Sequence, residues 1–204
     1  MIGFSLPSPV LESLLKKRIL EISGDIDAEM GDYIRTAFSW LITEGAPDIM
    51  ILFTSTGGSV ERGLEIYDML KAYPGKKTGV VIAFAQSMAA IILQACDRRL
   101  VLPHSTILVH NPNPAPDTRI KFHMFEDGTL MEKIYPHLKG SRQKFIDIIA
   151  GRIRGKSTEE IEALLDAGND LTADEAIVLG LADGILENLN ELSDQRPVRP
   201  NLPD

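Results

Sequence analysis

The chain has 204 residues and a mass of 22.5 kDa, which fits one ordinary domain. Its 44% hydrophobic and 25% charged residues are typical of a globular protein and exclude a collagen-like or wholly disordered chain. The formal net charge of −8 argues against a broad nucleic-acid surface, and the single cysteine, Cys96, excludes an intrachain disulfide and zinc sites that need two cysteines.

The chain start lacks the charged segment and long apolar run of a secretory signal, so we expect a cytoplasmic protein. One uncharged run, residues 79–96, has nearly the minimum length of a membrane span. Its first half is β-branched and its second half is rich in Ala, Ile and Leu, with Gln86, Ser87 and Gln94 inside it. This pattern predicts a buried strand that turns into a buried helix, and not a membrane segment.

Strand and helix patterns alternate along the first half of the chain. They predict a strand at Arg18–Ile22 with a turn at Gly24 and Asp25, a helix at Ala28–Thr43, a strand at Asp48–Thr54, a helix at about Val60–Tyr73, a strand at Gly79–Phe84, a helix at about Met88–Cys96, and strands at Arg99–Leu102 and Thr106–His110. This alternation predicts an α/β domain with repeated β-α units and a mainly parallel sheet.

The second half begins with a proline-rich loop, Asn111–Thr118. Residues 119–154 have a helical pattern that Gly128, Pro136 and Gly140 interrupt, so we expect two or more helices there. Ser157 and Thr172 are each followed by early carboxylates, which predicts a capped helix start at both sites; the second helix is expected to end near Leu179, with Gly180 as its stop. We expect a single domain over residues 1–192 and a flexible, Pro-rich tail over 193–204.

The strongest local feature is Ser87, which lies where an apolar strand becomes an apolar helix. A hydroxyl there sits at the carboxyl end of a sheet, where α/β folds bind ligands. The backbone N–H of Met88 would be a free donor in the first helical turn, suited to a developing oxyanion. The alternative is that Ser87 is only a helix N-cap.

His110 ends a strand and enters the proline-rich loop. It can face the same crevice as Ser87, and an imidazole is the side chain best suited to taking and returning a proton near neutral pH. The alternative is a loop histidine bonded to backbone. We interpret His104, His123 and His137 as surface residues.

Gly57, Gly58, Ser59 and Val60 follow a predicted strand. Paired glycines let a substrate backbone approach and expose amide N–H groups, so this segment is a candidate for substrate binding and for the second half of an oxyanion hole. A phosphate loop is less consistent, because the Gly-Lys-Ser/Thr ending is absent. A simple strand-to-helix turn is also possible. Cys96 is interpreted as a small core residue.

Several segments together carry a resemblance to a known family. The sequence resembles the proteolytic subunit of Clp protease (the ClpP family) over roughly residues 14–187, in order and at similar spacing. The matching segments are STGGSV at 55–60, AQSMA at 85–89, LPHSTILVHNP at 102–112, LLKKRI at 14–19, LTADEA at 171–176 and GLAD at 180–183.

The resemblance implies a ClpP/crotonase-like fold with a protruding helical handle region, and a serine peptidase. It implies Ser87 as nucleophile, His110 as general base, and the N–H groups of Gly58 and Met88 as the oxyanion hole. No metal or organic cofactor is implied. Handle residues 119–154 carry apolar side chains that suggest a ring-forming homo-oligomer: Ile120, Phe122, Met124, Phe125, Leu130, Ile134, Leu138, Phe145, Ile148 and Ile149.

Three departures from the family pattern matter. The family's catalytic aspartate falls, without gaps, on Gly168; a two-residue slip favours Asp170, and Asp166 is also near. The chain before the first strand is short, so we expect the family's axial loop, which helps to engage an unfoldase ATPase, to be reduced or missing. The region after His110 is longer than usual and is broken by Gly128, Pro136 and Gly140. In the family this region forms the handle helix and the strand that pairs two rings, so the resemblance implies ring stacking less securely than catalysis.

We therefore expect a self-compartmentalising serine endopeptidase that cleaves unfolded proteins or peptides through an acyl-enzyme, with an AAA+ unfoldase as a possible partner and with no nucleic-acid or membrane partner. The alternatives are a catalytically silent ring subunit or scaffold that keeps the fold, and a phage-type maturation protease. An acyl-CoA enzyme of the crotonase type is disfavoured, because such enzymes do not need a Ser–His pair.

Overall fold

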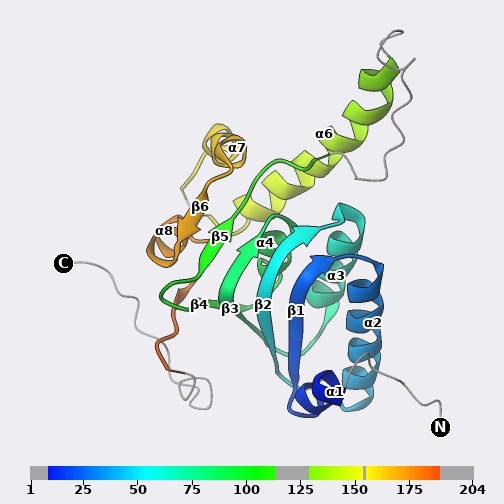
Figure 1. The fold of residues 1–204 in the computed structure, drawn as a ribbon. Helices are drawn as coiled ribbons and strands as arrows, with labels where there is room; N and C mark the ends of the chain where they lie inside the picture. Colours follow the sequence, from blue (N-terminus) through cyan, green and yellow to red (C-terminus); the bar gives the residue numbers. More distant parts are fainter. Residues whose placement is uncertain (1–8, 114–128, 154, 189–204) are drawn as a thin grey trace.

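A computed structural model describes residues 9–113, 129–153 and 155–188 (Figure 1). Its described residues form a seven-stranded sheet in the order β1-β2-β3-β4-β7, with β5 paired to β3 and β6 paired to β5. All these strand pairs are parallel except β5 with β6. The strands are β1 (Ile19–Ile26), β2 (Ile49–Gly58), β3 (Lys77–Gln86), β4 (Arg98–Val101), β5 (Thr106–Leu108), β6 (Asp170–Thr172) and β7 (Gly184–Ile185).

The helices are α1 (Pro9–Lys16), α2 (Ala28–Thr43), α3 (Val60–Ala72), α4 (Met88–Leu93), α6 (Thr129–Ala150), α7 (Thr158–Ala167) and α8 (Ala173–Leu179). The bounds predicted for α2 are confirmed, and Asp27 caps this helix by accepting a hydrogen bond from the Met30 N–H (3.0 Å). Helix α1 has no counterpart in the sequence analysis, because its eight residues are too few for a clear period.

The first two strands are longer than predicted. The expected turn at Gly24 and Asp25 is wrong, because β1 continues to Ile26 through an irregular step in the register between Ser23 and Asp25. Strand β2 likewise continues through both glycines, and Ile26 pairs with Gly58. This extension holds the glycine segment at the carboxyl end of the sheet.

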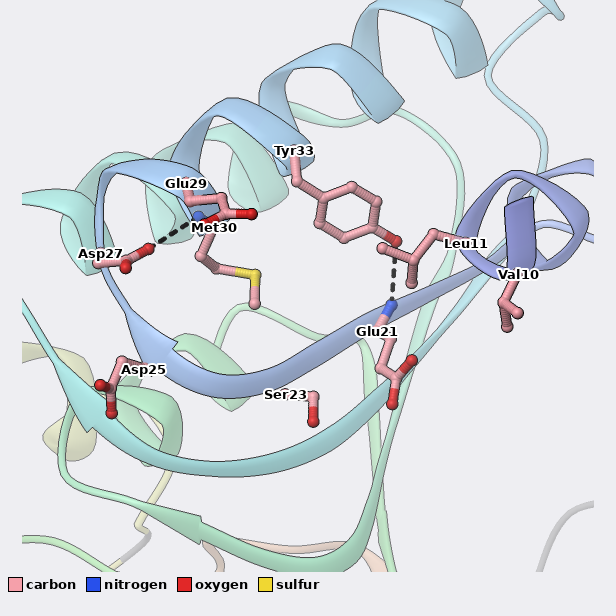
Figure 2. Close-up of a pocket in the computed structure, with 9 residues that line it drawn as sticks. All are labelled: Val10, Leu11, Glu21, Ser23, Asp25, Asp27, Glu29, Met30 and Tyr33. Carbon is pink, nitrogen blue, oxygen red and sulfur yellow. Dashed lines mark hydrogen bonds between the residues drawn. The ribbon is translucent and has the colours of Figure 1, made fainter. Parts of the chain in front are cut away.

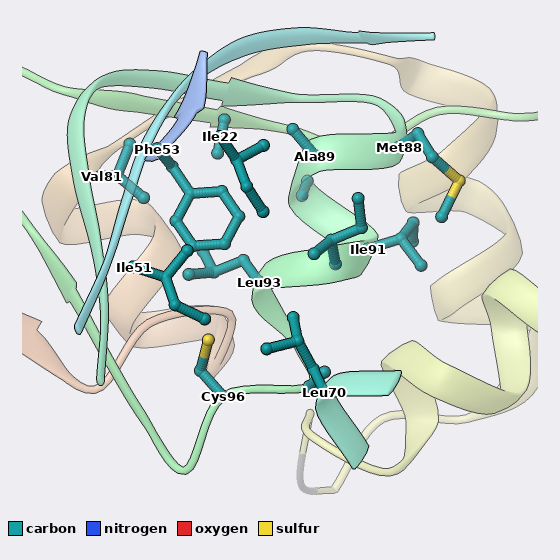
Figure 3. Close-up of a cluster of buried hydrophobic side chains, with 14 of the residues drawn as sticks. Ile22, Ile51, Phe53, Leu70, Val81, Met88, Ala89, Ile91, Leu93 and Cys96 are labelled. Carbon is teal, nitrogen blue, oxygen red and sulfur yellow. The ribbon is translucent and has the colours of Figure 1, made fainter. Parts of the chain in front are cut away.

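Helix α4 lies in the centre of the core, and all six of its residues are buried. Figure 3 shows Met88, Ala89, Ile91 and Leu93 of this helix among core side chains from the sheet, including Phe53. Residues 79–96 thus form most of β3 and all of α4, as the sequence predicts. Within the described residues, no helix is long and apolar enough to cross a membrane.

The two faces of the sheet differ. Figure 1 shows α2, α3 and α4 together behind the sheet, where Ile51, Phe53 and Val81 join the main core. The alternate residues of the same strands point the other way and form a separate cluster around Val80 and Leu100, with Met50, Leu52, Ile82 and Leu102 only partly buried. The described helices leave this second face uncovered (Figure 1).

Two of the three helix breaks predicted within residues 119–154, at Pro136 and Gly140, are wrong, and the third, at Gly128, lies outside the described residues. Helix α6 runs without a break from Thr129 to Ala150, through Pro136 and Gly140. Pro136 and Gly140 are exposed, so they disturb no core packing, while Phe145 and Ile149 bury the end of the helix in the domain. Residues 114–128, including Gly128, Ile120, Phe122, Met124 and Phe125, lie outside the described part of the chain, as does the predicted tail at 193–204.

Both predicted helix starts near the C-terminus are confirmed as capping boxes. Ser157 and Glu160 exchange hydrogen bonds at the start of α7, and Thr172 and Glu175 do so at the start of α8. Gly180 ends α8 in the left-handed conformation, as predicted.

The chain after α8 is fixed to the sheet by Arg99, a buried residue of β4. Its guanidinium forms an ion pair with Asp183, and its Nη1 donates to the Gly180 carbonyl (2.8 Å). The N–H of Asp183 in turn donates to the carbonyl of Arg99 (2.7 Å). These contacts place the short strand β7 beside β4.

A recess of about 560 Å³ lies beside β1, between α1 and α2 (Figure 2). The Tyr33 hydroxyl accepts a hydrogen bond from the Glu21 N–H at its centre (3.3 Å), and burial raises the pKa of Tyr33. Apart from Tyr33 and Glu21, its lining residues are Val10, Leu11, Ser23, Asp25, Asp27, Glu29 and Met30. Neither Ser87 nor His110 lines this recess, so it is separate from the candidate site described next.

Candidate active site

Ser87 occupies a strained turn between β3 and α4. Its backbone has φ 53° and ψ −122°, a region that residues with a side chain rarely adopt. Its N–H donates to the carbonyl of Leu108 in β5 (2.8 Å), which ties the turn to the neighbouring strand. Among the described residues, the Ser87 hydroxyl makes no cap hydrogen bond to α4. The simple N-cap role therefore does not explain this serine, and its hydroxyl is available for chemistry.

Gly57 lies directly against this turn. A Cβ atom on Gly57 would stand 2.7 Å from the Ser87 Cβ and 2.8 Å from the Met88 nitrogen, and the glycine itself has φ 94°. Only a residue without a side chain fits both the backbone conformation and the space. The end of β2 is thus in contact with the start of α4, where the Met88 N–H has no acceptor within its own helix.

The rest of the glycine segment follows the end of β2. Gly58 is exposed, and a Cβ there would lie 2.5 Å from the Ile26 carbonyl oxygen of β1. Ser59 caps α3 by accepting a hydrogen bond from the Arg62 N–H (3.3 Å), and Val60 begins that helix. The segment therefore passes from the carboxyl end of the sheet into α3 close to Ser87.

His110 lies just past β5, the strand whose Leu108 pairs with Gln86. Ser87 and His110 therefore leave the same end of adjacent parallel strands, and both are half-buried. The described residues contain no hydrogen bond between the two side chains. Gly168 lies beside the histidine: a Cβ on Gly168 would be 3.4 Å from the His110 Cβ.

The two candidate aspartates have other partners. Asp170, the first residue of β6, pairs with Leu108, and its Oδ1 accepts a hydrogen bond from Gln86 Nε2 (2.9 Å). Asp166 accepts a hydrogen bond from the Asn111 side chain (2.6 Å). Gly168, the position onto which the family's aspartate falls without gaps, adjoins His110 but carries no side chain. Gln86 and Asn111 were not predicted as contributors, because their partners lie far along the chain.

Cys96 and the other histidines lie where the sequence predicts, as far as the described residues extend. Cys96 is fully buried, and burial raises the pKa of its thiol to about 12, so the core role is confirmed. His104 and His137 are exposed as predicted, and His123 lies outside the described residues. The part of the chain that the structure describes contains no group of His, Cys, Asp and Glu side chains that could hold a metal ion.

Comparison with known proteins adds to this geometry. The family model for Clp protease matches residues 7–189, which is most of the chain. The chain belongs to the Clp protease family. It is 29% identical over 186 residues to an ATP-dependent Clp protease proteolytic subunit from Ligilactobacillus salivarius (strain UCC118), with 90% of each chain covered. It is 30% identical over 168 residues to the ATP-dependent Clp protease proteolytic subunit 1 of Chlamydia abortus (strain DSM 27085 / S26/3), with 81% of this chain and 84% of the relative covered.

The predicted family, its fold class and an enzyme of the serine endopeptidase type are therefore confirmed. The roles of individual residues stay predictions. The family assignment makes Ser87, at a strained strand-to-helix turn where its hydroxyl does not cap the helix, the residue around which those roles are best tested.

We expect Gly57→Ala to fold but to react with a fluorophosphonate about a hundredfold more slowly than the wild type, because the new methyl group must displace the Ser87 turn. Labelling rate and circular dichroism measure the two effects. Gly45→Ala is the matched control: Gly45 also has a positive φ (85°), but a Cβ there meets no atom within 4 Å. Equal labelling of both variants would contradict the close contact.

Proposed function

We propose that this chain is a serine endopeptidase that hydrolyses peptide bonds in unfolded proteins or peptides through an acyl-enzyme, within a ring of identical subunits. The relatives are named as proteolytic subunits of an ATP-dependent Clp protease, which supports the substrate class and the assembly. The sequence has no phosphate-binding loop, so ATP would be used by a separate AAA+ unfoldase. A cytoplasmic location stays a prediction.

The proposed chemistry starts at Ser87. His110 accepts the hydroxyl proton as Ser87 Oγ attacks the carbonyl carbon of the scissile peptide bond. The N–H groups of Gly58 and Met88 donate hydrogen bonds to the resulting oxyanion, while Gly57, Ser59 and Val60 border the substrate backbone. His110 then gives the proton to the leaving amine, and water attacks the acyl-enzyme to release the second product and regenerate Ser87.

The observation that carries this proposal is the Ser87 turn. A non-glycine residue with φ 53° costs folding free energy, about 1–3 kcal/mol for strained positions of this kind. The Ser87 hydroxyl makes no helix-cap hydrogen bond that would offset this free-energy cost. A strained serine at a strand-to-helix turn, with a hydroxyl that does not cap the helix, is the arrangement that presents a nucleophile.

A catalytically silent subunit is the second candidate, and the neighbourhood of His110 favours it. Gly168 adjoins the histidine and offers no carboxylate, while Asp170 is hydrogen-bonded to Gln86. An imidazole without an orienting carboxylate loses much of its catalytic advantage in a serine protease. Activity measurements on the purified chain separate the two candidates.

Ser87→Ala should abolish peptide hydrolysis and leave the fold and assembly unchanged, because the hydroxyl makes no cap hydrogen bond whose loss would weaken α4. Turnover of a fluorogenic peptide and the thermal midpoint test this expectation. The exposed Ser39→Ala, on α2, is the control and should retain full turnover. Normal turnover by Ser87→Ala would refute the nucleophile, and an inactive wild type would favour the silent subunit.

The third catalytic member is proposed to be Asp170. Asp170→Asn should then lower turnover by orders of magnitude with nearly unchanged stability, because the wrong imidazole tautomer is favoured. Two substitutions at Gly168 provide the counter-test: Asp and Asn both tolerate its left-handed backbone, but only Asp brings a charge beside His110. An active Asp170→Asn, with Gly168→Asp faster than Gly168→Asn, would identify the chain as a Ser–His dyad enzyme.

Of the apolar handle residues, Phe145 and Ile149 are buried within their own domain and offer no surface to a partner, while the side chains at 120–134 lie outside the described part of the chain. The sheet face that the described helices do not cover, with the partly buried Met50, Leu52, Ile82 and Leu102, supports association with further copies instead. Multi-angle light scattering should give a mass that is a multiple of 22.5 kDa. A monomer across a wide concentration range would count against the ring.

A further inference from the structure

The residue after His110 is fixed to helix α7 at two points. The backbone N–H of Asn111 donates to the carbonyl of Leu165 (3.2 Å), and its side-chain Nδ2 donates to Asp166 Oδ1 (2.6 Å). Both partners belong to the last turn of α7, the helix that ends at Gly168. The backbone that carries His110 is therefore attached to the helix whose C-terminal glycine, Gly168, lies next to the Cβ of His110.

Arg142 of α6 contacts both Asn111 and helix α7. Its Nε donates to Asn111 Oδ1 (2.9 Å), and its Nη1 donates to Glu162 Oε1 (2.7 Å). Its Nη2 lies 3.5 Å from Asp166 Oδ1. One guanidinium thus links α6, α7 and the His110 segment. A lysine could not reproduce these contacts, because it lacks the planar fork of donors.

We propose that Arg142 and Asn111 are positioning residues that set the orientation of His110 and couple it to helix α6. This inference rests on the proposed function. Its physical basis is that Gly168 supplies no side chain to hold the imidazole and that no hydrogen bond to the imidazole exists among the described residues. Asn111 and Arg142 hold the backbone that carries His110, so they help to set where the imidazole lies, whichever carboxylate orients its ring.

The competing interpretation is a purely structural link between α6 and α7. Such a link would change the free energy of unfolding but not the turnover of the folded molecules. A positioning role instead lowers kcat with little change in KM, because substrate binding does not involve these side chains. It also predicts that Arg142 and Asn111 act as one unit, so that their double variant is hardly slower than the slower single variant.

The test uses Arg142→Met, Arg142→Lys, Asn111→Ala and the double variant of Arg142→Met with Asn111→Ala. Arg35→Met is the matched control, since it also removes an arginine with two carboxylate partners, Asp32 and Glu65, but on α2. We expect Arg142→Met to lower kcat for a fluorogenic peptide about tenfold, the scale of one lost charge-assisted hydrogen bond, with KM changed less than about twofold. The kcat of Arg142→Lys should lie between those of Arg142→Met and the wild type, and the kcat of the Arg35→Met control should equal that of the wild type.

Hydrogen exchange provides a readout that does not need activity. The amide of Asn111 should exchange about tenfold faster in Arg142→Met than in the wild type, while amides of β1 and β2 stay unchanged. Unchanged exchange at Asn111, or a kcat equal to that of the wild type, would overturn the inference. An inactive wild type would refute the proposed function instead, and the exchange result would still decide whether Arg142 holds the His110 segment.

Discussion

The contact between Gly57 and the Ser87 turn constrains the rest of the site. Because a Cβ on Gly57 would lie 2.7 Å from the Ser87 Cβ, the end of β2 can lie this close to the start of α4 only with glycine at position 57. The burial of every residue of α4 then fixes that helix against the sheet. The strained backbone of Ser87 persists because packing on both sides leaves it no relaxed alternative.

The parallel sheet brings the remaining candidates to the same edge. Gln86 pairs with Leu108, and Leu108 pairs with Asp170, so that three chain segments far apart in sequence form one row. Ser87 and His110 continue two of these strands. This arrangement explains how an enzyme of the Clp protease family can assemble a site from short motifs separated by loops and helices.

Local signals accounted for much of the fold. The capping boxes at Ser157 and Thr172 and the full length of α2 follow from residues three or four positions apart. Elements that depend on distant partners were not predictable: β6 and β7 are short strands that exist through pairing with β5 and β4. The continuous α6 was also missed, because the packing of Phe145 and Ile149 outweighs the breaking tendency of Pro136 and Gly140.

In the candidate site, too, some residues can be recognised from local sequence and others depend on distant partners. Ser87, His110 and the paired glycines stand out because strand ends and glycines are visible in the sequence. The neighbour of His110 is not visible, because its contact with Gly168 spans 58 residues (168 − 110) and depends on how α7 packs. The hydrogen bonds of Gln86 with Asp170 and of Asn111 with Asp166 and Arg142 have the same long-range origin.

The central claim is that Ser87 is the reactive serine of this chain. It is tested most directly by reaction of the wild-type protein with a fluorophosphonate, followed by digestion and mass spectrometry to locate the modified residue. The account predicts one adduct per chain, on Ser87, formed faster in the native than in the denatured protein. An adduct on another serine, or no adduct under conditions where the fold is intact, would contradict it.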